Sequence, residues 1–382
     1  MALKEYTLEE IKELKALKVL GRTTESLSPL TLFWTGSGIE CNVKASELWI
    51  EVEADYDTYE PWMSIVINGT YVSRRMLSKG REWICLFRGM NPEVTKNIKV
   101  LKEVQAMPDD IAHRMQIHAM RVDGSFEKTP DRPYKIEFIG DSITSGEGSV
   151  GATIEEDWIS MWFSTQNNYA RMTADAVDAD FHIISQSGWG LFRAWDNNPY
   201  HVLPPFYEKV CGILKGEKNE ALGALKDYDF KSWQPDIVVI NLGTNDACAF
   251  TTPEWVDEKT GKGYKMRLNE DGTYNEEDLE TFKGAMVGFL TKLRKCNPNA
   301  TLIWVFGMLG AGLWDTVDEG VKLYKAQSGD QKVESLLLPD TTEETFGARQ
   351  HPGVLAHEAA SKVLAKRIKE ILNECVLMSM EK

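Results

Sequence analysis

The sequence has no long apolar run, no excess of basic residues and no paired cysteines. No run of about 18 apolar residues occurs, which is what a transmembrane helix needs, so we expect no membrane partner. The formal net charge of −15 also argues against nucleic acid, because nucleic acid binds basic surfaces. Acidic Glu5, Glu9 and Glu10 stand where a signal peptide would be apolar. These absences predict an intracellular, cytoplasmic protein.

The cysteines and histidines show none of the usual metal-binding spacings. No H-E-x-x-H motif and no C-x-x-C pair occurs, so we expect no metal site. Because intracellular thiols stay reduced, we expect free thiols rather than disulfides at all six cysteines: Cys41, Cys85, Cys211, Cys248, Cys296 and Cys375.

Short strand-like segments dominate the first third of the chain. Residues 48–54 alternate between apolar and acidic side chains, which is the period of a half-buried strand. Asn68-Gly69 lies between two apolar runs and predicts a two-residue hairpin turn. Thr7 and Glu10 have the spacing of a helix capping box. Many short strands separated by turns predict an all-β sandwich or jelly-roll domain over residues 1–125.

The pattern changes after residues 123–133, which are polar and turn-rich and mark a domain boundary. Strand-like runs then alternate with helical stretches, as in a parallel sheet covered by helices on both faces. Helical periodicity is clearest at 276–295 and 353–374. We therefore expect an α/β domain over residues 134–382, with these strands: 135–139, 181–184, 236–242, 301–307 and 335–338.

Three residues with a possible role in catalysis follow predicted strands, at the edge where open α/β sheets build their sites. They are Ser142, Gly188 and Asn245. A serine is a good nucleophile only when a base takes its proton and an oxyanion hole accepts the developing charge. Gly188 could offer a backbone N–H and Asn245 a side-chain amide for that purpose. The alternatives are a helix cap at Ser142, a turn glycine at Gly188 and an Asx turn at Asn245.

His351 is the best candidate for the base among six histidines. Pro352 favours an extended backbone at His351, which would present the imidazole ring from a loop. His357 lies inside the helical stretch that follows, so we expect a structural role for it. A serine, two oxyanion-hole candidates and a histidine together predict a hydrolase.

These segments resemble the conserved blocks of the SGNH (GDSL-like) hydrolases. The matching residues are Gly140-Asp-Ser-Ile143, Ser187-Gly188, Gly243-Thr-Asn-Asp246 and His351-Pro352. The resemblance implies a three-layer α/β/α hydrolase domain that needs no cofactor. It also implies that Ser142 is the nucleophile and His351 the base, with the backbone N–H of Ser142, Gly188 and Asn245 forming the oxyanion hole.

One position departs from that pattern. The family usually has an aspartate three residues before the histidine, where this sequence has Ala348. Losing the acid of a true triad costs on the order of 10⁴-fold in turnover. Together with the N-terminal β-domain and the segment 34–40, this departure makes the chain similar to carbohydrate esterase family 2. Members of that family use a serine–histidine dyad and orient the histidine ring with a backbone carbonyl.

That resemblance implies removal of O-acetyl groups, including 6-O-acetyl, from plant-derived manno-, glucomanno- or xylo-oligosaccharides through an acetyl-enzyme. The alternatives are an SGNH lysophospholipase or thioesterase and a non-catalytic carbohydrate-binding protein. An aromatic platform for the sugar is expected near the serine, with Trp314 as the first candidate, then Trp189 and Tyr200. Each of these aromatic residues could instead anchor a loop or belong to the core.

Overall fold

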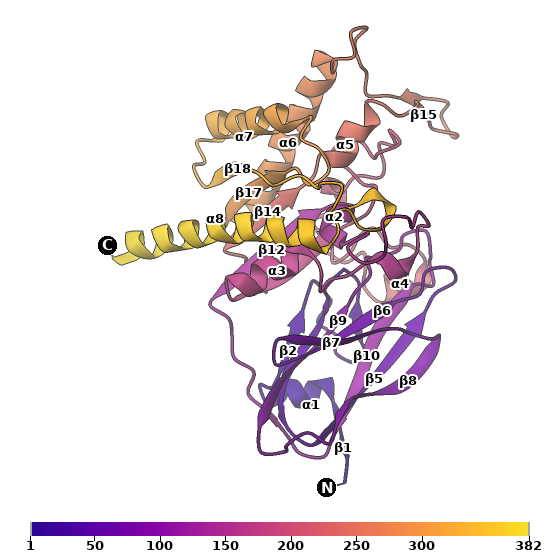
Figure 1. Cartoon of the computed structure of the whole chain (residues 1–382), viewed down its shortest axis with the longest axis vertical. Helices are drawn as coiled ribbons and strands as arrows, with labels where there is room; N and C mark the ends of the chain where they lie inside the picture. The colour runs from indigo at the N-terminus through magenta and orange to yellow at the C-terminus, as the bar shows by residue number, and fades with distance from the viewer. Residues whose placement is uncertain (1, 381–382) are drawn as a thin grey trace. The chain divides into compact units, whose positions relative to one another are not determined.

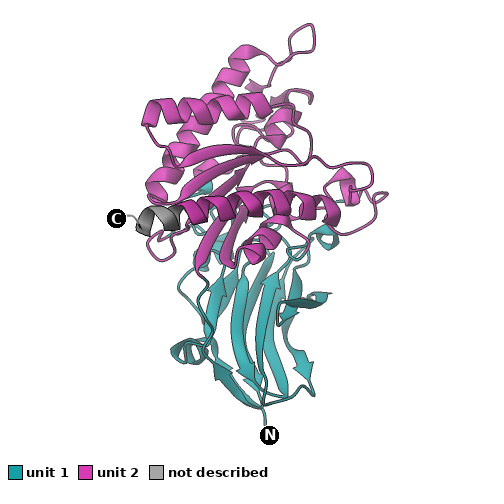
Figure 2. Cartoon of the chain, turned by 60° about the vertical axis from the view of Figure 1, so that its left-hand side comes forward, with its two compact units in different colours: residues 1–132, 158–166, 206–228 teal, residues 133–157, 167–205, 229–382 magenta. Residues whose placement is uncertain are grey.

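The chain forms two compact units (Figure 2). The computed structural model describes residues 2–380, and the side chains of residues 2–374, so that the side chain of Cys375 lies outside the described part. The first unit comprises residues 1–132, 158–166 and 206–228. The second comprises residues 133–157, 167–205 and 229–382.

Two short segments belong to the first unit although the predicted domain 134–382 includes them. Arg74 donates from Nη2 to the backbone oxygen of Phe163 at 2.7 Å, which ties the segment 158–166 to this unit. The indole nitrogen of Trp34 donates to the backbone oxygen of Val210 at 2.8 Å, within the segment 206–228. These are contacts between residues distant in sequence, so a composition change near residue 130 could not reveal them.

The first unit contains two antiparallel sheets (Figure 1). One consists of β1 (Lys4–Thr7), β10 (Arg114–Val122), β5 (Glu47–Asp55), β8 (Gly80–Arg88) and β3 (Leu30–Leu32). The other consists of β11 (Ser125–Glu127), β4 (Gly38–Lys44), β9 (Thr95–Lys102), β6 (Trp62–Ile67), β7 (Thr70–Met76) and β2 (Leu17–Leu20). The predicted β-rich region is confirmed, whereas its jelly-roll topology stays a prediction.

Three local sequence patterns in this unit form the structures that they predict. Every second residue of β5 from Leu48 to Ala54 is buried in the apolar core. Asn68 and Gly69 join β6 to β7 with φ values of 51° and 78°, which is the left-handed geometry that such a turn requires. Thr7 and Glu10 form the predicted capping box at the start of α1 (Leu8–Glu13). A further short helix is α4 (Glu217–Ala221).

The second unit is built on a parallel five-stranded sheet in the order β13-β12-β14-β17-β18. All five predicted strands are confirmed, with bounds that differ by at most two residues. They are β12 (Tyr134–Gly140), β13 (Ala179–Ser185), β14 (Ile237–Asn241), β17 (Thr301–Phe306) and β18 (Val333–Leu337). Continuous apolar stretches such as residues 237–240 are buried throughout, because helices cover both faces of such a sheet.

Two pairs of helices lie on opposite sides of this sheet (Figure 1). One pair is α6 (Glu276–Cys296) with α7 (Trp314–Ser328), and the other is α3 (Tyr169–Ala176) with α8 (Val354–Met380). Both helices predicted from periodicity, 276–295 and 353–374, correspond to α6 and α8. Between α3 and α6 in the sequence, β15 (Trp255–Val256) and β16 (Gly263–Tyr264) form a short antiparallel pair.

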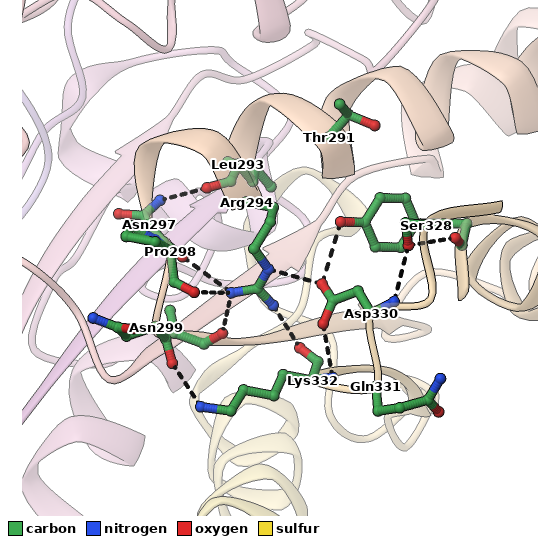
Figure 3. Close-up of polar contacts among 12 residues, drawn as sticks. Thr291, Leu293, Arg294, Asn297, Pro298, Asn299, Ser328, Asp330, Gln331 and Lys332 are labelled. Atoms are coloured by element: carbon green, nitrogen blue, oxygen red, sulfur yellow. Dashed lines mark hydrogen bonds and ion pairs between the residues drawn. The ribbon is translucent and has the colours of Figure 1, made fainter. Parts of the chain in front are cut away.

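Arg294 near the end of α6 holds the starts of two strands in place (Figure 3). Its Nη1 donates to the backbone oxygen of Ala300, just before β17, at 2.6 Å. Its Nη2 donates to the backbone oxygen of Lys332, just before β18, at 3.0 Å. Asp330 accepts from Nε at 2.7 Å. The amino ends of β17 and β18 are thereby fixed relative to α6. Among the described residues, no helix is both long enough and apolar enough to cross a membrane.

Candidate active site

Ser142 stands just beyond the carboxyl end of β12, at the first residue of the one-turn helix α2 (Ser142–Ser145). Asp141 caps this turn, because its Oδ1 accepts from the backbone N–H of Ile143 at 3.0 Å. A side chain at Gly140 would lie 2.1 Å from Oγ1 of Thr144, so the turn that follows β12 requires glycine there. The residue that caps this helix is therefore Asp141 and not Ser142. The Ser142 hydroxyl is available for another contact.

That contact is His351. The hydroxyl oxygen of Ser142 lies 3.0 Å from Nε2 of His351, and Nδ1 of the same ring lies 2.8 Å from the backbone oxygen of Arg349. A carbonyl oxygen only accepts hydrogen bonds, so Nδ1 must carry the proton that it donates. In the neutral ring Nε2 is then the acceptor, and it faces the serine hydroxyl. This is the tautomer that a general base needs.

The loop before His351 has an unusual backbone. Arg349 and Gln350 have φ values of 57° and 53°, in the left-handed region that non-glycine residues rarely adopt. Ala348 is buried, and its N–H donates to the backbone oxygen of Gly148 at 3.0 Å. A side chain at Gly148 would lie 2.6 Å from Cβ of His351. The loop that follows Ser142 and the loop that carries His351 are therefore in direct backbone contact.

Gly188 and Asn245 lie beyond the ends of β13 and β14. Gly188 has a φ of 77°, which glycine adopts freely. Asn245 lies in α5 (Thr244–Ala249), and its amide nitrogen donates to the backbone oxygen of Trp189 at 3.0 Å and to Oδ2 of Asp141 at 3.3 Å. The amide of Asn245 thus links the loops that follow three adjacent strands, β13, β12 and β14.

Residues 138–336, more than half of the chain, match the GDSL-like lipase/acylhydrolase family. The chain belongs to this family. The matched region includes Ser142, Gly188 and Asn245, and it ends before His351. Membership of this family confirms the predicted enzyme class, which is carboxylic ester hydrolase.

Solved structures extend the likeness to nearly the whole GDSL-like chain. An acetyl xylan esterase from the rumen bacterium Butyrivibrio proteoclasticus shares 47% identity, with a TM-score of 0.96, over 98% of this chain and 99% of that chain. A family two carbohydrate esterase from Clostridium thermocellum has the same fold at 23% identity, with a TM-score of 0.77, over 94% of this chain and 99% of that chain. The resemblance to carbohydrate esterase family 2 is confirmed.

Two curated relatives match this chain over part of their own length. The cellulase/esterase of Acetivibrio thermocellus is 24% identical over 89% of this chain, which spans 37% of that protein. An acetylxylan esterase/glucomannan deacetylase of Cellvibrio japonicus is 25% identical over 60% of this chain and 61% of its own length. The chain therefore spans less than two thirds of either relative.

Two buried carboxylates, Asp141 and Asp246, lie in the GDSL-like site, and no sequence pattern predicted a role for them. Asp246 accepts from the backbone N–H groups of Leu191, Phe192 and Arg193 at 2.8–2.9 Å, which shapes the loop after Gly188. Burial raises the pKa of Asp246 in spite of these bonds. Burial likewise raises the pKa of Asp141 to about 7. Both carboxylates support the loops of the site through hydrogen bonds.

Glu147 is a further residue that the sequence did not indicate. Its side chain is 2% exposed, and Oε1 lies 2.9 Å from Nε of Arg349 and 3.9 Å from Nε2 of His351. A glutamate in a polar turn carries no local signal of burial. Its partners come from a loop about 200 residues further along the chain.

The three predicted aromatic candidates lie in different surroundings. Trp189 is buried and stacks on His201 with ring centroids 5.1 Å apart. Tyr200 is exposed, and its hydroxyl donates to Oδ2 of Asp257 at 3.0 Å. Trp314 is half-buried at the start of α7. Trp195, which the sequence analysis did not name, is 53% exposed, and its Cδ1 would lie 3.1 Å from a Cβ on Gly188.

Proposed function

We propose that this chain is a carbohydrate O-acetyl esterase that acts on plant-derived oligosaccharides. The observation that carries the proposal is the alignment of Ser142 Oγ, His351 Nε2 at 3.0 Å, and the Arg349 carbonyl at 2.8 Å from Nδ1. The substrate class rests on the 47% identity to an acetyl xylan esterase along the full chain. Acetylated manno-, glucomanno- and xylo-oligosaccharides, with 6-O-acetyl groups included, are the proposed substrates.

In the first half-reaction the Ser142 oxygen attacks the acetyl carbonyl while His351 Nε2 takes the serine proton. The carbonyl oxygen becomes an oxyanion, which the backbone N–H groups of Ser142 and Gly188 and the amide of Asn245 stabilise. When this intermediate collapses, the ester bond to the sugar breaks. His351 then gives its proton to the departing sugar oxygen, which leaves as a hydroxyl group, and the acetyl group stays on Ser142.

In the second half-reaction a water molecule replaces the sugar. His351 takes one proton from the water, whose oxygen attacks the acetyl carbonyl of the acyl-enzyme. The bond to Ser142 then breaks, His351 returns the proton to the serine oxygen, and acetic acid is released, which loses its remaining proton to the solvent to give acetate. Nε2 serves as base and acid in turn because the Arg349 carbonyl keeps the other ring proton on Nδ1.

Asn245 can join the oxyanion hole by exchanging one contact. An amide nitrogen carries two hydrogens. One donates to the Trp189 carbonyl at 3.0 Å and orients the group. The other makes the longer contact of 3.3 Å with Asp141, and an oxyanion would attract it more strongly than this long contact does.

We propose Trp195 as the aromatic surface for the sugar, ahead of Trp314, Trp189 and Tyr200. It is the half-exposed indole next to Gly188. If it stacks on the sugar, Trp195→Ala should raise KM for acetylated oligosaccharides and scarcely change KM for a small aryl acetate. Trp314→Ala is the matched comparison. Equal effects of Trp195→Ala on both substrates would contradict a sugar-binding role.

Time-resolved NMR of acetylated manno- and xylo-oligosaccharides tests the function directly, because it reports the sugar and the position together. Wild-type protein should release acetate, whereas Ser142→Ala should retain less than about one per cent of the rate. Faster hydrolysis of long-chain esters would favour a lysophospholipase or thioesterase. No turnover at all would favour a carbohydrate-binding protein. The jelly-roll topology, the cytoplasmic location and the absence of a cofactor stay predictions.

A further inference from the structure

The acceptor that orients His351 belongs to a residue in a disfavoured backbone conformation. The Arg349 carbonyl lies 2.8 Å from Nδ1 of His351, and Arg349 has a φ of 57°. A non-glycine residue adopts this conformation only when its surroundings hold it there. The carboxylate of a triad reaches the histidine ring with its side chain and does not need an unusual backbone conformation. A backbone carbonyl does need one here, so other contacts must hold the Arg349 carbonyl in place.

Arg349 is held by the segment that follows the nucleophile. Its side-chain Nε donates to Oε1 of Glu147 at 2.9 Å, and its Nη1 donates to the backbone oxygen of Glu156 at 2.6 Å. Its own backbone N–H donates to the oxygen of Glu155 at 2.7 Å. Three hydrogen bonds from one residue to a short stretch of chain restrict its backbone rotation.

Glu147 connects this anchor to Ser142. Its backbone N–H donates to the Ser142 carbonyl at 3.0 Å, so it is part of the turn that presents the nucleophile. Its side chain is 2% exposed, and a buried carboxylate is stable as an anion only when it is paired. The guanidinium of Arg349 is that partner. The same carboxylate oxygen lies 3.9 Å from Nε2 of His351, the atom that becomes charged when it takes the serine proton.

We propose that the Glu147–Arg349 ion pair is a positioning device that stands in for the third member of the triad. It keeps the Arg349 carbonyl on Nδ1 of His351. Glu147 and Arg349 act through His351, so they are positioning residues. The inference rests on the proposed roles of Ser142 and His351.

Two variants separate the anchor from the backbone conformation. Arg349→Gly removes the side chain but adopts a positive φ without strain, so the loop can still fold. Glu147→Gln keeps the shape of the side chain and removes its charge. Each should lower kcat on a small aryl acetate by about 10- to 100-fold, because small displacements of a catalytic group cost this much. KM should stay within about twofold, since neither residue is proposed to touch the substrate. Arg349→Lys, which retains the charge, should recover part of the lost rate.

The double variant tests whether the two residues act as one unit. If they do, Glu147→Gln in the Arg349→Gly background should cost little more, because coupled residues are not additive. Glu334→Gln is the matched control, since it removes a partly buried pair with Arg367 between β18 and α8. This control should leave kcat unchanged and lower the melting temperature about as much as Glu147→Gln does.

The outcomes separate the two proposals. Activity in Ser142→Ala or His351→Ala would overturn the proposed function itself. If those variants are inactive while Glu147→Gln and Arg349→Gly keep kcat within about twofold of wild type, only the positioning role is overturned. Additive losses in the double variant, or a rise in KM with kcat unchanged, would also overturn it.

Discussion

The residue three positions before His351 is Ala348, and no carboxylate can act from there. The acids near His351 in the sequence have other partners. Asp340 accepts from the backbone N–H groups of Gly310 and Thr341, and Glu344 accepts from the hydroxyl of Thr342. Neither contact involves the histidine, which agrees with a ring oriented by a backbone carbonyl.

We therefore expect the neighbouring acids to matter little for catalysis. Each single change to the corresponding amide should leave kcat within about tenfold of wild type, whereas removing a true triad acid costs on the order of 10⁴-fold. Steady-state kinetics on an aryl acetate checks this, with His351→Ala as the inactive reference. A loss of a thousandfold or more in one variant would identify a displaced triad acid. The residues to change are Asp340, Glu343, Glu344 and Glu358.

Asn245→Ala should lower kcat by about 10²–10³-fold, the typical effect of removing one oxyanion-hole donor. The contact with the Trp189 carbonyl would be lost as well, so the melting temperature must be measured alongside kcat. Asn245→Asp is the matched variant, because it keeps the size of the side chain and removes the donor. Intact kcat with an altered KM would contradict an oxyanion role.

At the scale of elements, Arg294 anchors the end of the sheet opposite the one that carries the site. Arg294 fixes the starts of β17 and β18 through two backbone oxygens and Asp330 (Figure 3). The loops that present Ser142, Gly188 and Asn245 all leave the carboxyl ends of strands in this sheet.

Arg294→Ala should lower the free energy of unfolding by about 1.5–3 kcal/mol, the usual value for hydrogen bonds to a charged group. Lys322→Ala is the control. It removes an ion pair with Asp318 in which the lysine is mostly exposed, and such pairs contribute about 0–1 kcal/mol. Denaturant titration measures both variants. Equal stability losses would contradict the anchoring role of Arg294.

The strands and long helices of the second unit were predictable because their signals are local. A continuous apolar run such as residues 237–240 is buried in the sheet, and α6 lies within one residue of its predicted bounds. Grouping of segments 158–166 and 206–228 with the first unit was not predictable. It depends on partners such as Arg74 and Trp34, which lie far away in the sequence.

At the scale of the whole molecule, each unit contains a buried histidine that resists protonation. Burial lowers the pKa of His113 in the first unit and of His357 in the second to about 3 in each case. His357 accepts from the backbone N–H of Tyr169 through Nδ1 at 3.1 Å, a contact that protonation of Nδ1 would break. Both histidines are therefore neutral in the folded state at neutral pH.

This predicts a stability that falls in mild acid. A histidine with a folded pKa near 3 and an unfolded pKa near 6.5 binds protons preferentially when unfolded between these values. The contribution of the neutral histidine to the free energy of unfolding is complete above pH 6.5, and it is lost as the pH falls toward 3. By pH 5 each histidine should have lowered the free energy of unfolding by about 2 kcal/mol, because a shift of one pKa unit corresponds to about 1.4 kcal/mol.

Melting curves between pH 7.5 and about pH 5 measure the effect. His357→Gln and His113→Gln should each flatten the dependence of melting temperature on pH, in the unit that carries the substitution. Equal slopes for the wild type and both variants would contradict the assignment to these two histidines. Comparison at pH 7.5 separates any general loss of stability from the pH effect.

The β-rich first region, the parallel sheet, and the candidates Ser142, Gly188, Asn245 and His351 could all be predicted from the amino-acid sequence. These depend on short-range patterns, such as a glycine after a strand or a proline after a histidine, which act through the backbone of a few adjacent residues. Three contacts became visible only in the folded chain: the Arg349 carbonyl on His351, the buried Glu147 on Arg349, and Trp195 beside Gly188. Such contacts join segments far apart in the chain, where burial and strain arise from packing rather than from local sequence.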